Sequence, residues 1–229
     1  MSEFLLELYS EEIPPQLQIN ARNQLKNKIE AILSEKEIKF KECLEFSSPT
    51  RLTIYLNGLP NKIKIQSKEI KGPKISVPDS VVKSFVNSRN IAEKYLYKKK
   101  TEKGEFYFAK TPEDEILIDN LLIDILPKVL SSINWKKSMK WSTNSLMWGR
   151  PLRAIYAVFN EKKLIFKYYH LESADTITVE QNLSKSSKKI KNFKEYKLFL
   201  KKNNIFVDQN ERKKIILDGI KKISKLKYF

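Results

Sequence analysis

The sequence predicts an α+β fold in which antiparallel β-hairpins and their sheet pack against helices, arranged as two subdomains. Several short segments alternate apolar and polar residues and occur as neighbouring pairs joined by turn residues, which is typical of antiparallel hairpins. Longer segments repeat apolar residues at helical spacing. The chain has 229 residues, 41% hydrophobic and 11% aromatic, which is enough for one large or two small domains with a proper core.

The first predicted strand covers residues 3–10, because Phe4, Leu6 and Leu8 fall on one face and Glu7 falls on the other. Turn residues such as "SSPT" at 47–50 and "TEKG" at 101–104 join later strands into hairpins. The other predicted strands are residues 38–46, 51–59, 61–73, 94–100, 105–110, 152–159 and 164–171.

The clearest long helix is predicted for residues 112–133. Pro112 suits a first helical turn, the acidic residues 113–115 complement the helix dipole, and Pro127 should kink or break the helix. Asp208 and Glu211 have the spacing of a capping box at the start of the last helix, whose apolar stripe has little left to pack on. The remaining predicted helices run from Pro14 to about residue 33, over 78–90 and over 193–204.

The domain prediction places residues 1–183 in one α+β region, with a possible division near 75–112. Residues 184–229 form a more polar, basic helical segment that we expect to start a following domain.

Charge is the strongest compositional feature of the chain. There are 44 Lys and Arg against 27 Asp and Glu, a formal net charge of +17. Such an excess favours a polyanionic partner, because binding releases the counterions condensed on phosphates. The alternative is a genome that is biased toward lysine codons.

Residues that could perform catalysis are scarce. The chain has one histidine, His170, and one cysteine, Cys43, so no metal site and no Cys–His pair is expected. We therefore predict no catalytic residue, no metal and no bound cofactor. A single thiol, no signal peptide and no long apolar run predict a cytoplasmic protein that does not enter a membrane.

The candidate nucleic-acid contacts are basic side chains and tryptophan. Arginine is rare beside lysine here, and its planar fork binds phosphate or carboxylate in a bidentate way. Arg51, Arg150 and Arg153 are therefore either phosphate contacts or, as the alternative, members of buried salt bridges with early glutamates. The full set of candidate tRNA-binding residues is Arg51, Lys98, Lys99, Lys100, Lys140, Trp148, Arg150 and Arg153. Of the two tryptophans in this region, Trp141 is predicted in the core beside Met139, and Trp148 closer to the surface.

Five phrases resemble, in order, the β subunit of the bacterial heterotetrameric glycyl-tRNA synthetase. They are "FLLELYSEEIP" from Phe4, "SSPTRLTIYLNGL" around Arg51, "KEIKGP" ending at Pro73, "VVKSFVNSRNI" and "KSMKWSTNSLMWGRPLRAIYAVFNEKKLIF". The resemblance covers nearly the whole chain. Two departures stand out: the family's subunit is much longer, and its Gly-His-Arg motif is absent from "TITVEQNL". The chain is thus expected to be an N-terminal fragment, one piece of a split gene or a decayed copy.

The resemblance implies a division of labour between two subunits. A separate α subunit would carry the active site and use ATP with Mg, while this β-subunit region would bind tRNA within an α2β2 tetramer. The implied function is support of ATP-dependent attachment of glycine to its tRNA by a glycine–tRNA ligase, with this chain as a non-catalytic part. The alternatives are a stand-alone basic RNA-binding module and a protein-interaction domain without a synthetase role.

Overall fold

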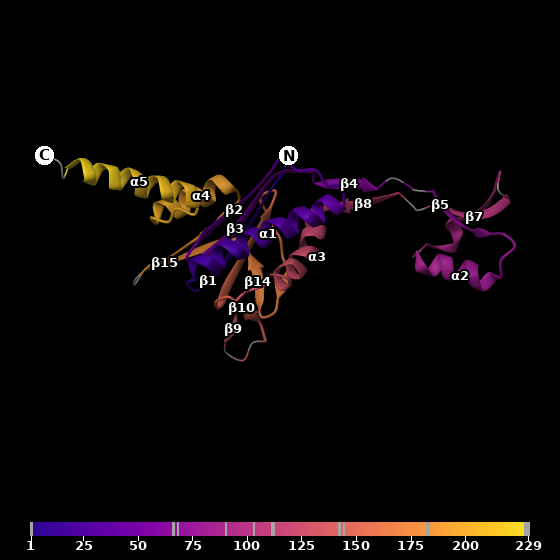
Figure 1. Ribbon diagram of the computed structural model, residues 1–229, viewed down its shortest axis with the longest axis horizontal. Coiled ribbons are helices and arrows are strands. Elements are labelled where there is room, and N and C mark those ends of the chain that lie inside the picture. The colour runs from indigo at the N-terminus through magenta and orange to yellow at the C-terminus, as the bar shows by residue number, and fades with distance from the viewer. Residues whose placement is uncertain are drawn as a thin grey trace. The chain divides into compact units, whose positions relative to one another are not determined.

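The computed structural model describes residues 2–65, 67, 69–89, 91–102, 104–110, 113–141, 143, 145–181 and 184–226. The chain divides into two compact units. The main unit consists of Met1–Asn61 and Ile118–Phe229, and the inserted unit consists of Lys62–Leu117. The predicted α+β class is confirmed (Figure 1). The two breaks fall at different places from the predicted boundary at 183/184, which lies between two strands that pair with each other.

The main unit is built around a twisted sheet whose central strand is β1 (Ser2–Ser10). This strand pairs antiparallel with two neighbours, so its backbone groups are bonded on both sides. In spatial order the strands are β13 (Lys167–Tyr168), β14 (Leu171–Ala174), β11 (Leu152–Phe159), β1, β3 (Arg51–Leu59) and β2 (Glu42–Ser48), and β12 (Lys162–Lys163) pairs with β11. Strand β14 runs parallel to β11, and the other pairs are antiparallel.

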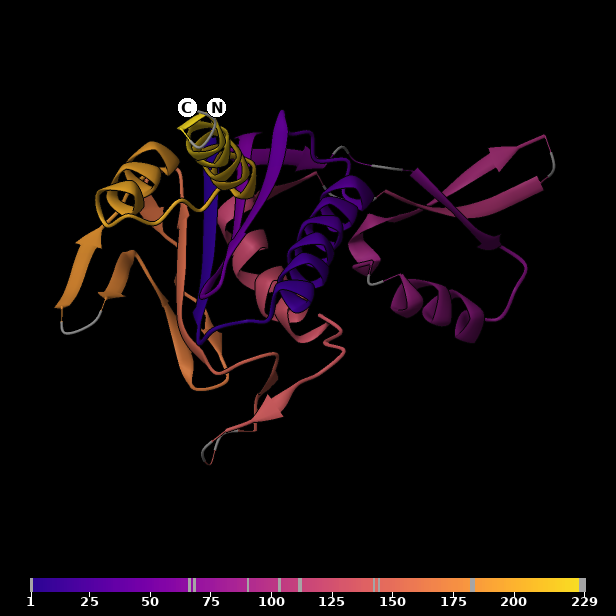
Figure 2. The ribbon, with the colours of Figure 1, turned by 60° about the vertical axis from the view of Figure 1, so that its left-hand side comes forward.

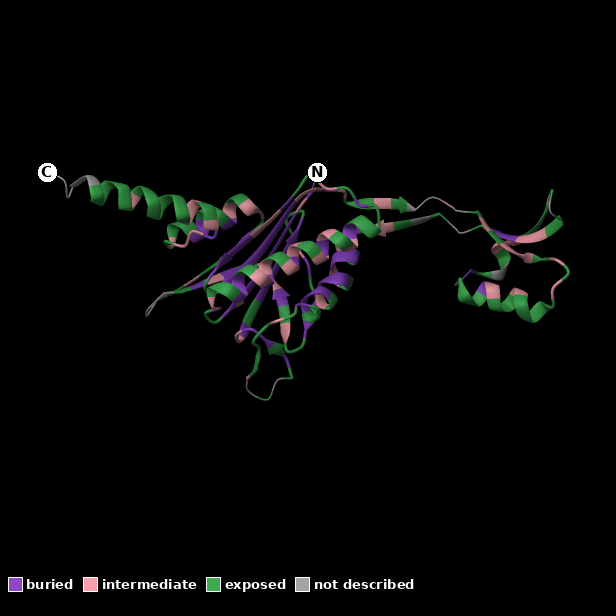
Figure 3. Cartoon of the chain, viewed as in Figure 1, coloured by how far each residue is buried: buried purple, intermediate pink, exposed green. Residues whose placement is uncertain are grey.

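Helices cover one face of this sheet, and a hairpin with a further helix covers the other (Figure 2). The first layer contains α1 (Pro15–Glu35) and α3 (Ile118–Ser131). The second contains the hairpin β15 (Thr176–Gln181) with β16 (Ser184–Lys189), followed by α4 (Phe193–Lys202). Because both faces are covered, the sheet strands are largely buried (Figure 3).

A cluster of buried residues attaches the layer of β15, β16 and α4 to the central sheet. Leu5 of β1 and Tyr156 of β11 pack with Ile177 of β15, and with Tyr196 and Leu200 of α4. The last helix, α5 (Gln209–Leu226), begins at the predicted cap, because Asp208 Oδ1 accepts from the backbone N–H of the helix. Its apolar residues remain exposed: Ile215, Ile216, Leu217, Ile220 and Ile223.

The inserted unit has a two-stranded stem and a small three-stranded sheet. The stem pairs β4 (Lys62–Ile65) with β8 (Asp114–Leu117), and the sheet has the order β5 (Glu69–Lys74), β7 (Gly104–Lys110), β6 (Leu96–Thr101). Helix α2 (Asp79–Ser88) and a short 3₁₀ turn (Glu93–Tyr95) connect β5 to β6.

Several local predictions differ from the structure in their extent or their pairing. Residues 61–73 form two strands instead of one, and residues 114–117 form β8 in place of the first helical turn, with Pro112 outside the described residues. Helix α3 continues past Pro127, so of the kink or break expected there, the break is absent. The predicted strand 164–171 is not one strand paired with 152–159: only the two residues of β12 pair with the end of β11, and residues 164–171 contain β13 and the start of β14.

The other predicted strands and helices are confirmed within a few residues. The main unit also contains a hairpin of two short strands, β9 (Met139–Lys140) and β10 (Met147–Trp148), with two residues each. Within the described part of the chain, no helix is long and apolar enough to cross a membrane.

Candidate nucleic-acid interface

A buried ion pair links the first two central strands. The Arg51 guanidinium donates to Glu7 Oε1 at 2.6 Å and to the Thr178 carbonyl at 2.6 Å, and it lies 4.5 Å from the centre of the Tyr9 ring. Arg51 is 1% exposed and Glu7 2%. Strand β1 places Glu7 on the same face as Leu5, and this face is covered by α4.

Tyr196 of α4 completes this buried network. Its hydroxyl donates to Glu7 Oε2 at 2.5 Å and lies 2.8 Å from Thr53 Oγ1. Burial and the Glu7 charge raise the pKa of Tyr196 well above 10, so the phenol keeps its proton and Thr53 donates to it. Burial also raises the pKa of the Glu7 carboxyl, whereas the Arg51 charge and the two hydrogen bonds oppose that rise.

This geometry decides between the two interpretations of Arg51. A guanidinium that is 1% exposed and engaged with a carboxylate and a carbonyl cannot reach a phosphate in solution. The interpretation of Arg51 as a tRNA contact was therefore wrong, and the alternative of a buried salt bridge with an early glutamate is correct.

Beside this network, the surface is hollowed where β1 ends. The hollow has a volume of about 450 Å³ and is lined by Tyr9, Ser10, Glu11, Glu12, Thr50, Arg150 and Arg153. Tyr9 connects the two regions, because its ring covers the Arg51 guanidinium and Tyr9 also lines the hollow.

The two arginines of the hollow are held differently. Arg153 is exposed and forms ion pairs with Glu11 at 3.6 Å and Glu180 at 3.1 Å. Arg150 is half-buried and donates to the Gly149 carbonyl at 2.9 Å, and within the described residues it has no ion pair. Arg150 therefore presents the guanidinium that is less compensated by carboxylates, which is the arrangement an anionic ligand needs.

The two tryptophans do not lie where they were predicted. Trp148 is 1% exposed and packs against Trp135 and Tyr168, with ring centres 5.0 and 6.0 Å away. Trp141 is half-buried and lies edge-on to His170 at 6.4 Å. The prediction of a surface Trp148 that contacts tRNA, with Trp141 in the core, was wrong.

Gly149 carries the signal that sequence reasoning missed. A Cβ at this position would lie 2.3 Å from the Trp135 ring, so the glycine lets Trp135 approach the backbone beside Trp148. A glycine directly after a tryptophan was a sign of close packing there.

The candidate lysines are not among the residues that line the hollow. Lys140 is exposed on β9, while Lys98, Lys99 and Lys100 are exposed on β6 of the inserted unit. Strand alternation separates these three, so that Lys99 faces one side of the sheet and its two neighbours face the other. Lys99 Nζ is bonded to the Glu69 carboxylate at 2.9 Å.

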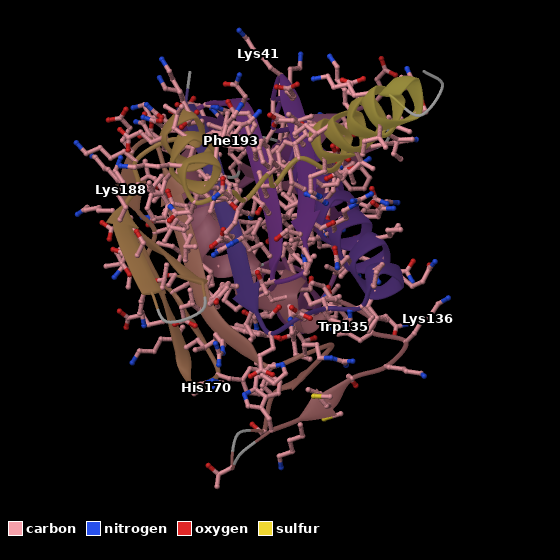
Figure 4. The ribbon with its side chains drawn as sticks, turned by 90° about the vertical axis from the view of Figure 1, so that its left-hand side faces the viewer. Lys41, Trp135, Lys136, His170, Lys188 and Phe193 are labelled. Atoms are coloured by element: carbon pink, nitrogen blue, oxygen red, sulfur yellow. The ribbon has the colours of Figure 1, made fainter. Side chains whose placement is uncertain are left out.

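The greatest concentration of charge is at the C-terminal end of the sequence. Residues 184–229 contain 15 Lys and Arg against 4 Asp and Glu, an excess of +11 out of +17 for the chain. Lys188 on the β15–β16 hairpin and Lys136 after α3 point outward on opposite sides of the main unit (Figure 4). Among the described residues, no group of three or more His, Cys, Asp or Glu is placed to hold a metal ion.

Comparison with known proteins gives a consistent match. The family described as "Glycyl-tRNA synthetase beta subunit" matches residues 4–228. The chain is 34% identical over 221 residues to the glycine–tRNA ligase beta subunit of Rickettsia akari (strain Hartford), and 33% identical over 221 residues to that of Rickettsia peacockii (strain Rustic). Each alignment covers 96% of this chain and 33% of the relative. The chain thus spans about a third of the length of the curated relatives it matches.

Proposed function

Because the chain belongs to the glycyl-tRNA synthetase β-subunit family, we propose that it is a tRNA-binding part of a glycine–tRNA ligase, supporting ATP-dependent attachment of glycine to its tRNA. The observation that carries this proposal is the family match, which extends over residues 4–228 instead of a single motif.

The distribution of charge supports a role in binding RNA. An excess of +17, of which +11 lies in residues 184–229, attracts a polyanion and releases its counterions. The lysines would contact phosphates and so position the RNA. Arg150, at the rim of the hollow, adds a planar donor that can hold a phosphate in a bidentate way.

We place the chemical step outside this chain. The partner would be the α subunit of an α2β2 tetramer, which would use ATP and Mg in the cytoplasm. A direct test is to purify the chain with separately produced α subunit and to follow co-elution by size-exclusion chromatography with light scattering. A stable complex supports the partnership, and two separate peaks at micromolar concentrations would refute it for this region.

The affinity for tRNA tests the central proposal. The purified chain is titrated with glycine tRNA and with an unrelated tRNA at several salt concentrations around 0.15 M. A preference for glycine tRNA is the expected result. Equal affinity for both tRNAs would favour a stand-alone basic RNA-binding module, and no salt-dependent binding would favour a protein-interaction domain.

Two variants locate the contact within the main unit. Arg150→Ala should weaken tRNA binding, whereas Lys162→Ala removes the same charge from β12, away from the residues that line the hollow. Equal losses of tRNA affinity in the two variants would mean that Arg150 contributes only its positive charge and makes no specific contact.

A further inference from the structure

The small sheet of the inserted unit has one covered face. Ile70 of β5, Ala109 of β7 and Leu96 of β6 lie side by side on it, and Ala109 is 0% exposed. Helix α2 packs here, since a Cβ on Gly72 would lie 3.0 Å from the Phe85 ring. The core of the inserted unit is therefore on this side.

The opposite face carries rings and lysines in alternation. Lys71, Phe108 and Tyr97 are paired across the three strands, and Phe106 is paired with Lys99 in the next row. We call these five residues the aromatic face. The Tyr97 and Phe108 rings are stacked with centres 6.2 Å apart, and Tyr97 is 37% exposed.

Each of the two phenylalanine rings of the aromatic face has a lysine ammonium group above it. Lys71 Nζ lies 3.7 Å from the centre of the Phe106 ring, and Lys99 Nζ lies 5.1 Å from that of Phe108. Glu69 fixes the edge of the face by accepting from the Tyr97 hydroxyl and from Lys99. The Tyr97 hydrogen bond, followed by Lys99, lowers the pKa of this carboxyl, so Glu69 is ionised at neutral pH.

We propose that the aromatic face binds unpaired RNA, with a base stacking on the exposed Tyr97 ring and phosphates held by Lys71 and Lys99. Rings on an open sheet face accept the flat surface of any base, and adjacent ammonium groups follow the backbone. A duplex keeps its bases inside the helix and cannot use the rings. The inference rests on the proposed function, in which the RNA is tRNA, and it adds that a single-stranded segment is what this unit binds.

Strand alternation supplies matched controls within three consecutive residues. Lys98 and Lys100 lie on the covered side of β6, and Lys98 Nζ is 5.8 Å from the Tyr107 ring there. All three lysines are exposed and carry the same charge. Only Lys99 should contact the RNA that is stacked on the aromatic face.

The experiment uses the full chain and a fluorescein-labelled 12-nucleotide RNA without self-complementarity. Fluorescence anisotropy gives the Kd for the single strand and for its duplex at 0.1 and 0.3 M salt. We expect the single strand to bind more tightly than the duplex. Tyr97→Ala should weaken single-strand binding about tenfold, as expected for the loss of one stacked base, and Tyr97→Phe should stay within about twofold of the wild type because it keeps the ring.

The lysine variants and a tyrosine of the main unit complete the comparison. Lys99→Ala should weaken binding more than Lys98→Ala or Lys100→Ala. It should also reduce the slope of log affinity against log salt concentration by the amount expected for about one phosphate contact. Tyr169→Ala removes a tyrosine that is 55% exposed in the main unit and should change nothing. Far-UV circular dichroism checks that each variant is folded.

Three results would overturn the proposal: tighter binding of the duplex, wild-type affinity of Tyr97→Ala, or equal losses for the three lysine variants. Should Tyr97→Ala fail to fold, the lysine comparison and Tyr97→Phe still decide. The preference of the wild-type chain for glycine tRNA is measured in parallel. If that preference is present while Tyr97→Ala binds like the wild type, only the aromatic face is refuted; if the preference is absent, the proposed function fails by itself.

Discussion

Arg51→Met tests whether the buried ion pair holds the main unit together. The substitution keeps a long side chain but leaves the Glu7 carboxylate, 2% exposed, without its cation. Breaking one side of a buried pair costs about 3–5 kcal/mol. If the free energy of unfolding falls by about 2 kcal/mol per M urea for a unit of this size, the urea concentration at the unfolding midpoint should fall by about 1.5–2.5 M.

Urea unfolding followed by tryptophan emission is the appropriate assay, since Trp135, Trp141 and Trp148 all lie in the main unit. Arg153→Met is the matched control, because that arginine forms its ion pairs at the exposed surface. Exposed pairs contribute about 0–1 kcal/mol. If Arg51→Met were as stable as Arg153→Met at pH 8, the argument for a structural Arg51 would be wrong.

The pH dependence of Arg51→Met follows from the same carboxyl. Burial already raises the pKa of Glu7 above 4.5 in the presence of Arg51, and without the cation it rises further. The folded variant then keeps a proton that the unfolded chain has released, so its stability falls as pH increases above about 4.5. The loss of unfolding free energy relative to the wild type should be larger at pH 8 than at pH 5.5. The double variant Arg51→Met, Glu7→Gln should lose the same free energy at both pH values.

Three further predictions concern single side chains. Burial raises the pKa of the Cys43 thiol to about 12, so Ellman's reagent at pH 8 should react with this thiol only when the chain unfolds. The urea midpoint should fall as pH rises above 9.0, because only the unfolded chain loses the thiol proton there. Gly149→Ala should lower stability by about 1–3 kcal/mol through the clash with Trp135, whereas Gly219→Ala, with nothing within 4 Å, should raise it by about 0.5–1 kcal/mol; the reverse order of urea midpoints would contradict both. Trp148→Phe should lower the urea midpoint and leave tRNA affinity unchanged, and a selective loss of affinity would restore a surface role.

Local patterns were sufficient to predict most elements of the fold but could not specify the long-range partners. The alternation in residues 3–10 identified β1 correctly, yet it placed Glu7 on a polar face. That inference assumes a sheet with one wet face, whereas β1 is covered on both sides. Besides Arg51, the buried Glu7 carboxylate has a second partner, Tyr196, which lies 189 residues away. No local pattern connects Glu7 with Tyr196.

The division considered near 75–112 lies inside the inserted unit Lys62–Leu117, but its bounds were not predicted, for a related reason. Its stem joins β4 to β8 across about fifty residues of intervening sequence, and each strand has only four residues. Residues 113–115 are acidic and precede an apolar helix, so the rule for helix starts applies to them equally well. Pairing with β4 overrides that preference and turns 114–117 into a strand.

The way arginine is used limits where specificity for a particular tRNA can arise. Of the six arginines in the chain, Arg150 donates to the adjacent Gly149 carbonyl, and four others are engaged with groups farther along the sequence. Arg51 and Arg153 are in ion pairs, Arg22 donates to Ser47 Oγ, and Arg212 donates to the Ser47 carbonyl. Lysines, which hold phosphates as point charges, supply most of the remaining positive surface. Binding should therefore be strongly salt-dependent and weakly selective among tRNAs over most of the surface, and the aromatic face should add a preference for unpaired over paired RNA instead of a preference for particular bases.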